Sequence, residues 1–109
     1  DKLHGMVHIT GGGFYDNIPR ALPKNLGVEI DSTAWTVPTI FQLLQEWGNV
    51  DWREMYRTFN CGIGMVLIVD AESFSDFVTH LNENYETFYK IGRVVEGEGV
   101  KISGGVFND

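Results

Sequence analysis

Three consecutive glycines near the start of the chain constrain its local fold more than any other feature. Gly11, Gly12 and Gly13 directly follow an apolar run that contains Val7 and Ile9. Glycine lacks a side chain and accepts positive φ, at the cost of backbone entropy. Such a run is typical of places where the backbone turns sharply or approaches a ligand closely. The pattern predicts a strand over residues 5–10 that ends in a tight glycine loop.

The residues around this loop are suited to binding an anion. Backbone N–H groups of successive residues can form an anion-binding concavity, and an arginine adds a fork of donors. Thr10 offers a hydroxyl, Arg20 a guanidinium, and Asn17 an amide that could orient a polar substrate group. Structural alternatives stay open: a flexible turn, a helix cap by Asp16 and Asn17, and a surface ion pair of Arg20 with Asp16 or Glu29.

Three further side chains, those of His8, Arg57 and Cys61, are of types that can take part in catalysis or ligand binding. His8 ends the predicted strand, where open sheets often place ligand sites, but a hydrogen bond to a loop carbonyl explains it better. Arg57 either reaches a cleft or braces its own loop. Cys61 has no local histidine or basic cluster to lower its pKa, which favours a packed thiol over a nucleophile. The catalytic residue is left unassigned, with His8 as a candidate. The predicted substrate- or phosphate-binding residues are Thr10, Gly11, Gly12, Gly13, Asn17, Arg20 and Arg57.

The charge balance and the cysteine count exclude several classes of function. A formal net charge of −7 argues against nucleic acid and anionic membrane surfaces as partners. A single cysteine cannot form an internal disulfide, and no apolar run approaches the roughly 20 residues of a membrane span. We therefore expect a cytoplasmic protein. No metal site is predicted, because His4 and His8 would lie about 13 Å apart along a strand.

The hydrophobic pattern predicts a single α+β domain with a small mixed or largely antiparallel sheet flanked by helices. The continuous apolar run Met65–Val69 is typical of a central strand buried on both faces. Gly92 is interpreted as a bulge, and residues 104–109 are expected to fray. Gly48 is expected to end the predicted helix 38–48. Asp51 is expected to cap the start of the helix that follows. The predicted helical segments are 17–22, 38–48, 51–60 and 73–83. The other predicted strands are 28–31, 88–95 and the short edge strand 100–102.

Three motifs occur in a specific order: Val7–Gly13, Asn17–Pro23 and Glu54–Met65. Together they resemble the C-terminal domain of the phosphoribosylformylglycinamidine cyclo-ligase (AIR synthetase) family. The likeness covers about residues 5–95. It implies a ferredoxin-like element within the fold. It also implies that residues 1–109 are a single partial domain, without the family's N-terminal ATP-binding and dimerisation domain.

The resemblance implies an ATP-dependent ring closure in de novo purine biosynthesis. The parent enzyme would convert formylglycinamidine ribonucleotide to aminoimidazole ribonucleotide, with release of ADP and phosphate. ATP and Mg²⁺ would bind mainly outside this chain, the full-length enzyme would be a homodimer, and residues 8–20 would line one wall of the cleft. The chain alone is expected to be inactive. The alternatives are a selenophosphate synthetase-like member of the superfamily and a non-catalytic module that binds a small phosphorylated ligand.

Overall fold

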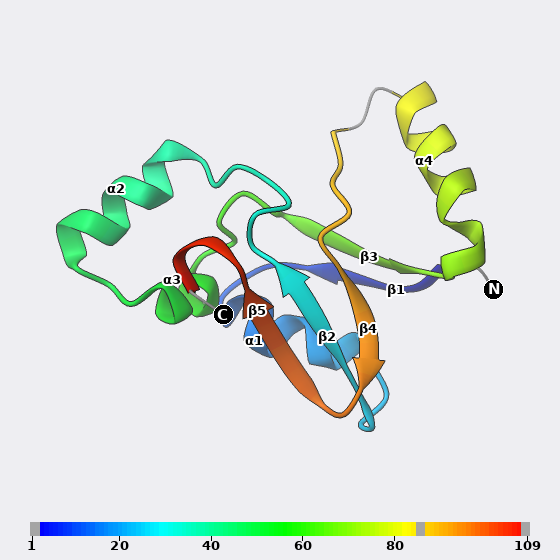
Figure 1. The fold of residues 1–109 in the computed structure, drawn as a ribbon, viewed down its shortest axis with the longest axis horizontal. Coiled ribbons are helices and arrows are strands. Elements are labelled where there is room, and N and C mark those ends of the chain that lie inside the picture. Colours follow the sequence, from blue (N-terminus) through cyan, green and yellow to red (C-terminus); the bar gives the residue numbers. More distant parts are fainter. Residues whose placement is uncertain (1–2, 85–86, 108–109) are drawn as a thin grey trace.

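In residues 3–84 and 87–107, which the computed structural model describes, the strands form two small sheets (Figure 1). One sheet is an antiparallel ribbon, and the other has a central strand with one antiparallel and one parallel neighbour. The ribbon consists of β1 (Leu3–His8) and β3 (Met65–Val69). The second sheet has the order β4 (Gly92–Glu96), β2 (Leu26–Asp31) and β5 (Gly99–Ser103). This mixture of helices with antiparallel and parallel pairing confirms the predicted α+β class.

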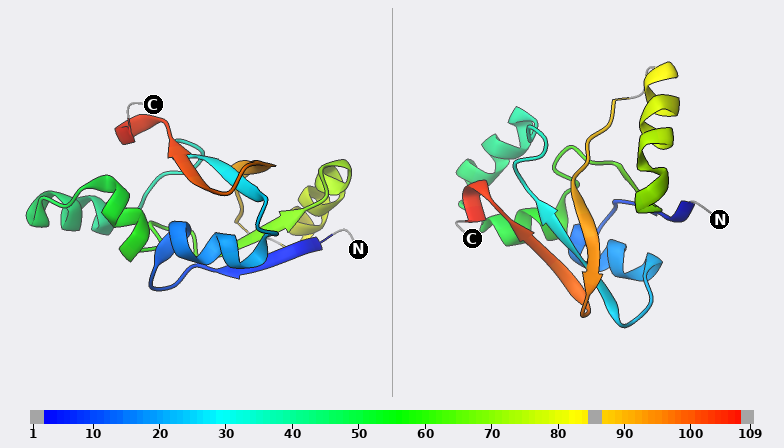
Figure 2. Two further views of the ribbon diagram at one scale, coloured as in Figure 1. Left: turned by 90° about the horizontal axis from the view of Figure 1, so that it is seen from below. Right: turned by 45° about the vertical axis from the view of Figure 1, so that its right-hand side comes forward.

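Short helices connect these strands. The α-helices of the described residues are α1 (Gly13–Asn17), α2 (Thr39–Gly48), α3 (Trp52–Thr58) and α4 (Phe74–Glu83). The 3₁₀ turns are η1 (Ile18–Ala21), η2 (Ala71–Ser73) and η3 (Gly105–Phe107). Helix α1 and turn η1 contact strands of both sheets, while α2 and α4 project at opposite ends of the molecule (Figures 1 and 2).

Local signals explain where two helices begin or end. The Asp51 side chain accepts a hydrogen bond from the Arg53 N–H at 2.8 Å, which caps α3 as the sequence predicts. Helix α2 ends at Asn49, which adopts the left-handed conformation with φ 49°. The prediction that Gly48 would take this position was wrong by one residue, because asparagine also tolerates the left-handed region.

Aromatic side chains from distant segments form the centre of the core. Phe14 stacks on Trp35 with ring centroids 5.9 Å apart, and Tyr56 meets Phe14 edge-on at 5.4 Å. Phe107 packs on Tyr56 at 5.4 Å and is buried. The prediction that residues 104–109 fray is therefore wrong over 104–107, because η3 places an aromatic ring in the core. Residues 108–109 lie outside the described residues.

Two strand predictions also need correction. Within the described residues β3 pairs with β1 alone, and Met65 is 50% exposed, so β3 is not a central strand buried on both faces. The predicted strand 88–95 starts only at Gly92, which keeps regular register opposite Ile30 and forms no bulge. Glycine is needed there because a Cβ would overlap the carbonyl oxygen of Glu29.

Candidate functional site

The glycine loop joins β1 to α1 and lies beside a second loop. The Ile9 N–H donates to the Gly64 carbonyl at 2.9 Å, which holds the two loops together. The Gly13 N–H donates to the Thr10 carbonyl at 2.9 Å and closes the turn. Strand β1 stops at His8, so residues 9–10 leave the predicted strand to build this turn.

The three glycines meet different requirements. Gly12 and Gly13 have φ of 95° and 61°, a region that side-chain-bearing residues adopt only at a cost. A Cβ at Gly13 would also overlap the Tyr56 carbonyl oxygen, so this glycine allows α1 to pack on α3. Gly11 has open space around it. Within the described part of the chain, the N–H groups of Gly11 and Gly12 donate to no acceptor, which leaves two donors available to a ligand.

The buried Asn17 side chain fixes the shape of this loop. Its Oδ1 accepts a hydrogen bond from the Thr10 N–H at 2.7 Å, and its Nδ2 donates to the Gly11 carbonyl at 3.4 Å. It makes no side-chain helix cap, so that alternative was wrong. No direct signal in the sequence points to this brace, because its hydrogen bonds span six and seven residues. Direct contact between Asn17 and a substrate stays a prediction.

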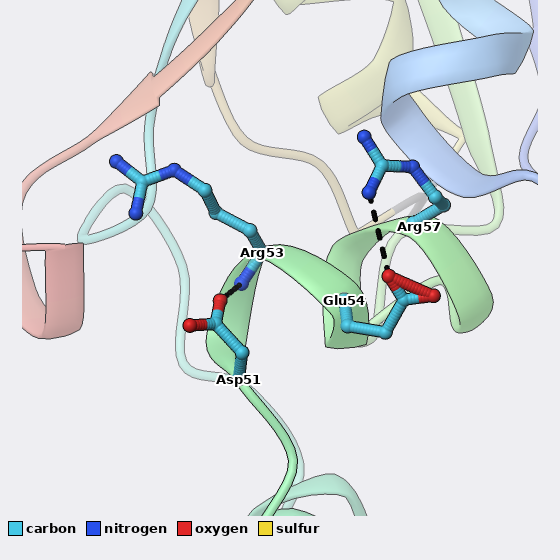
Figure 3. A network of polar contacts seen from close by, with 4 residues as sticks. All are labelled: Asp51, Arg53, Glu54 and Arg57. Atoms are coloured by element: carbon cyan, nitrogen blue, oxygen red, sulfur yellow. Dashed lines mark hydrogen bonds and ion pairs between the residues drawn. The ribbon is translucent and has the colours of Figure 1, made fainter.

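Arg57 is the predicted cation that the fold places beside the loop. A Cβ added to Gly13 would lie only 2.8 Å from the Arg57 Cα, so the two backbones are in close contact. The Arg57 guanidinium lies 5.0 Å from the centroid of the Tyr15 ring. Nη1 of Arg57 also pairs with Oε2 of Glu54 at 3.3 Å, as Figure 3 shows. Sequence reasoning missed Tyr15, which faces this arginine from α1. Burial raises the pKa of Tyr15, while the positive charges of Arg53 and Arg57 oppose that shift.

Arg20 lies away from the loop. It belongs to η1, and the helical segment between Gly13 and Arg20 is about 12 Å long. The next residue, Ala21, packs against Gly5. In the part of the chain that the structure describes, neither Asp16 nor Glu29 pairs with it. Glu29 instead forms an ion pair with Arg93, with Oε1 and Nη2 3.0 Å apart. The alternative that Arg20 pairs with either carboxylate was therefore wrong.

His8 and Cys61 have contrasting environments. His8 is exposed at the end of β1, opposite Met65. Cys61 is completely buried, and its carbonyl accepts a hydrogen bond from the Trp35 indole N–H at 3.0 Å. Burial raises the pKa of the Cys61 thiol to about 12, which keeps it protonated near neutral pH. The interpretation of Cys61 as a packed residue is confirmed.

The loop therefore has two N–H donors and the Thr10 hydroxyl, with the Arg57 backbone beside Gly13 and the Asp16 carboxylate beside Gly12. The Arg57 guanidinium itself contacts Tyr15 and Glu54. N–H, hydroxyl and guanidinium groups are the donors that a phosphate or another small oxyanion requires. Among residues 3–84 and 87–107, no group of three or more His, Cys, Asp or Glu side chains is placed to hold a metal ion. Across the same residues, no helix combines the length and apolar character needed to cross a membrane.

Comparison with known proteins gives concordant matches. The family model described as "AIR synthase related protein, C-terminal domain" matches residues 1–105. A phosphoribosylformylglycinamidine cyclo-ligase of Geobacillus sp. (strain WCH70) is 52% identical over 107 residues, which are 98% of this chain and 31% of the relative.

Relatives from other bacteria carry the same name. The cyclo-ligase of Thermoanaerobacter sp. (strain X514) is 53% identical over 98 residues, covering 90% of this chain and 29% of the relative. That of Neisseria meningitidis serogroup C is 52% identical over 97 residues, covering 89% of this chain and 28% of the relative. The chain thus spans less than a third of the length of these curated relatives.

Proposed function

The chain belongs to the AIR synthase related protein, C-terminal domain family, and from this premise we propose that it is part of a phosphoribosylformylglycinamidine cyclo-ligase. The observation that carries the proposal is sequence identity: over nearly the whole chain, about half of the residues are identical to those of proteins with that name. This identity favours the cyclo-ligase over a selenophosphate synthetase-like activity and over a non-catalytic module. The full-length protein would act on formylglycinamidine ribonucleotide and form aminoimidazole ribonucleotide.

In this proposal the chain supplies one wall of the substrate cleft. The N–H groups of Gly11 and Gly12 would donate to the substrate phosphate, while the Thr10 hydroxyl and the Arg57 guanidinium complete the set of donors. Asn17 would act by holding the loop, because its amide group already bonds Thr10 and Gly11. Arg20 and His8 stay weaker members of the proposed site, because no hydrogen bond or ion pair within the described residues holds either side chain toward the glycines.

In this proposal ATP and Mg²⁺ bind mainly outside this chain. Among the described residues no group of three or more His, Cys, Asp or Glu side chains is placed to hold a metal ion. We therefore assign ATP and Mg²⁺ mainly to the rest of the polypeptide, as the family resemblance implies. When bound there, ATP would supply the phosphoryl group that activates the formyl oxygen for displacement by an internal nitrogen. The proposal also includes a cytoplasmic homodimer as the full-length form. The described chain then contributes substrate binding and orientation.

Turnover by the full-length polypeptide tests this function. Purified protein is given ATP, Mg²⁺ and either formylglycinamidine ribonucleotide or selenide, and ADP, phosphate and the second product are measured. We expect substrate-dependent ADP release with equimolar aminoimidazole ribonucleotide. Turnover with selenide alone would contradict the proposal, as would absence of ring closure by folded protein. Residues 1–109 alone are expected to show no turnover in the same assay.

A further inference from the structure

The long side chain of Arg57 is held by two contacts at its charged end. The side chain is 49% exposed, so packing alone does not fix its direction. Its Nη1 lies 3.3 Å from Oε2 of Glu54 on the same helix, and an exposed ion pair of this kind contributes little free energy. Its guanidinium carbon lies 5.0 Å from the centroid of the Tyr15 ring, which belongs to α1. The Tyr15 ring therefore ties this guanidinium to a second element of the fold.

Helix α1 connects the glycine loop to both ends of this arginine. Gly13 is the first residue of α1, and its backbone is in close contact with that of Arg57. Tyr15 follows two residues later in the same short helix and contacts the guanidinium. The glycine loop, the Arg57 backbone and the Arg57 guanidinium are therefore held in one arrangement.

The contact between Tyr15 and Arg57 leaves donors of the guanidinium available. Burial raises the pKa of Tyr15, so its hydroxyl keeps the proton near neutral pH and the ring carries no charge. The attraction is consequently that of a cation for the electron-rich face of an aromatic ring. Within the described residues, Nη2 and Nε of Arg57 donate to no acceptor, which leaves N–H groups that match the geometry of an oxyanion.

We propose that Tyr15 is a positioning residue that holds the Arg57 guanidinium for the phosphate of formylglycinamidine ribonucleotide. This role rests on the proposed function, and Tyr15 acts through Arg57 without touching the substrate. Nη2 and Nε of Arg57 donate to the phosphate oxygens, together with the N–H groups of Gly11 and Gly12. A guanidinium that is already held loses less side-chain entropy when the substrate binds, so the ring improves affinity and leaves the chemical step unchanged.

Steady-state kinetics of the full-length protein test this role. Tyr15→Leu removes the ring and should raise KM for formylglycinamidine ribonucleotide about two- to fivefold with kcat unchanged, as expected for an exposed cation–π contact. Tyr15→Phe keeps the ring and is the matched control, so both constants should stay at the parent values. In the Arg57→Ala background, Tyr15→Leu should cause no further rise in KM, because the side chain that it positions is gone.

Three kinetic outcomes would overturn the proposal. An unchanged KM in Tyr15→Leu would show that the ring does not contribute to substrate binding. An equal rise in KM in Tyr15→Phe and Tyr15→Leu would assign the effect to the hydroxyl. A full additional rise in the Arg57→Ala background would show that Tyr15 acts independently of Arg57.

Side-chain NMR of Arg57 in the same full-length protein, without ligand, gives a readout that does not depend on catalysis. The ring current of Tyr15 should displace the Arg57 Nε–H signal from the position of a free arginine in the parent protein and in Tyr15→Phe. In Tyr15→Leu the signal should return toward that position, and an unchanged signal would overturn the proposal. If the parent protein lacks ring closure, the proposed function fails, and this signal still decides whether Tyr15 positions the guanidinium.

Discussion

The Thr10 N–H donates to Oδ1 of Asn17 at 2.7 Å, and this bond ties the glycine loop to the last residue of α1. Because the Asn17 side chain is buried, the loop is held in one shape before any ligand arrives. The N–H groups of Gly11 and Gly12 are thereby preorganised. Preorganised donors avoid part of the entropic cost of binding.

Replacement of Asn17 by alanine should weaken the fold. The substitution leaves the Thr10 N–H without its acceptor, so we expect the free energy of unfolding to fall by about 1–3 kcal/mol. Urea unfolding of the full-length protein measures this change. Asn17→Asp keeps an acceptor for the Thr10 N–H, but it buries a carboxylate and places one of its oxygens against the Gly11 carbonyl, so it should also lower stability. Its negative charge should in addition weaken binding of an anionic substrate. Unchanged stability in Asn17→Ala would contradict the bracing role.

Substitutions of two adjacent glycines should have different effects. Gly13→Ala forces a side chain into the contact with Tyr56 at φ 61°, and should destabilise the protein by about 3 kcal/mol or more. Gly11→Ala meets open space, so its effect on unfolding should stay within about 0.5 kcal/mol. If Gly11 contacts the substrate phosphate, the Gly11 variant should instead raise KM. Equal stability of the two variants would contradict this assignment.

Two arginines test which cation serves the proposed site. Arg57→Ala should raise KM for formylglycinamidine ribonucleotide about 10- to 100-fold, because a hydrogen bond to a charged group contributes about 1.5–3 kcal/mol. Arg20→Ala is the matched control and should change KM less than about threefold, since Arg20 lies at the far end of η1. Steady-state kinetics of the full-length enzyme compare them. A larger increase in KM for Arg20→Ala than for Arg57→Ala would mean that Arg20, and not Arg57, serves the proposed site.

Cys61 should make stability depend on alkaline pH. Burial raises its pKa from an ordinary value of 9.0 to about 12, so the folded state binds the thiol proton more tightly than the unfolded state. Its stabilising contribution is complete below pH 9 and is lost as pH rises toward 12. Cys61→Ala removes the dependence that the thiol itself causes. The pKa of Tyr56 stays raised in both proteins because burial is its main cause, although the Cys61 thiolate adds to that shift in the parent protein. Parallel stability curves from pH 8 to pH 11 would contradict the prediction.

The sequence was sufficient for the local features of this protein. Glycine conformational freedom predicted the sharp turn after β1, the Asp51 cap predicted the start of α3, and apolar periodicity located α2 and α4. These features depend on backbone sterics and on neighbours three or four residues away, which a sequence displays directly. The motifs also identified the family without reference to the structure.

Tertiary structure alone decided the partners of each element. It placed Arg57 beside the glycine loop and Arg20 at the other end of η1, used Asn17 as a brace, and buried Phe107. It also left β3 at an edge, although its apolar sequence is that of an interior strand. A sequence pattern reports which side chains avoid water, but contacts between distant segments depend on how the whole chain packs.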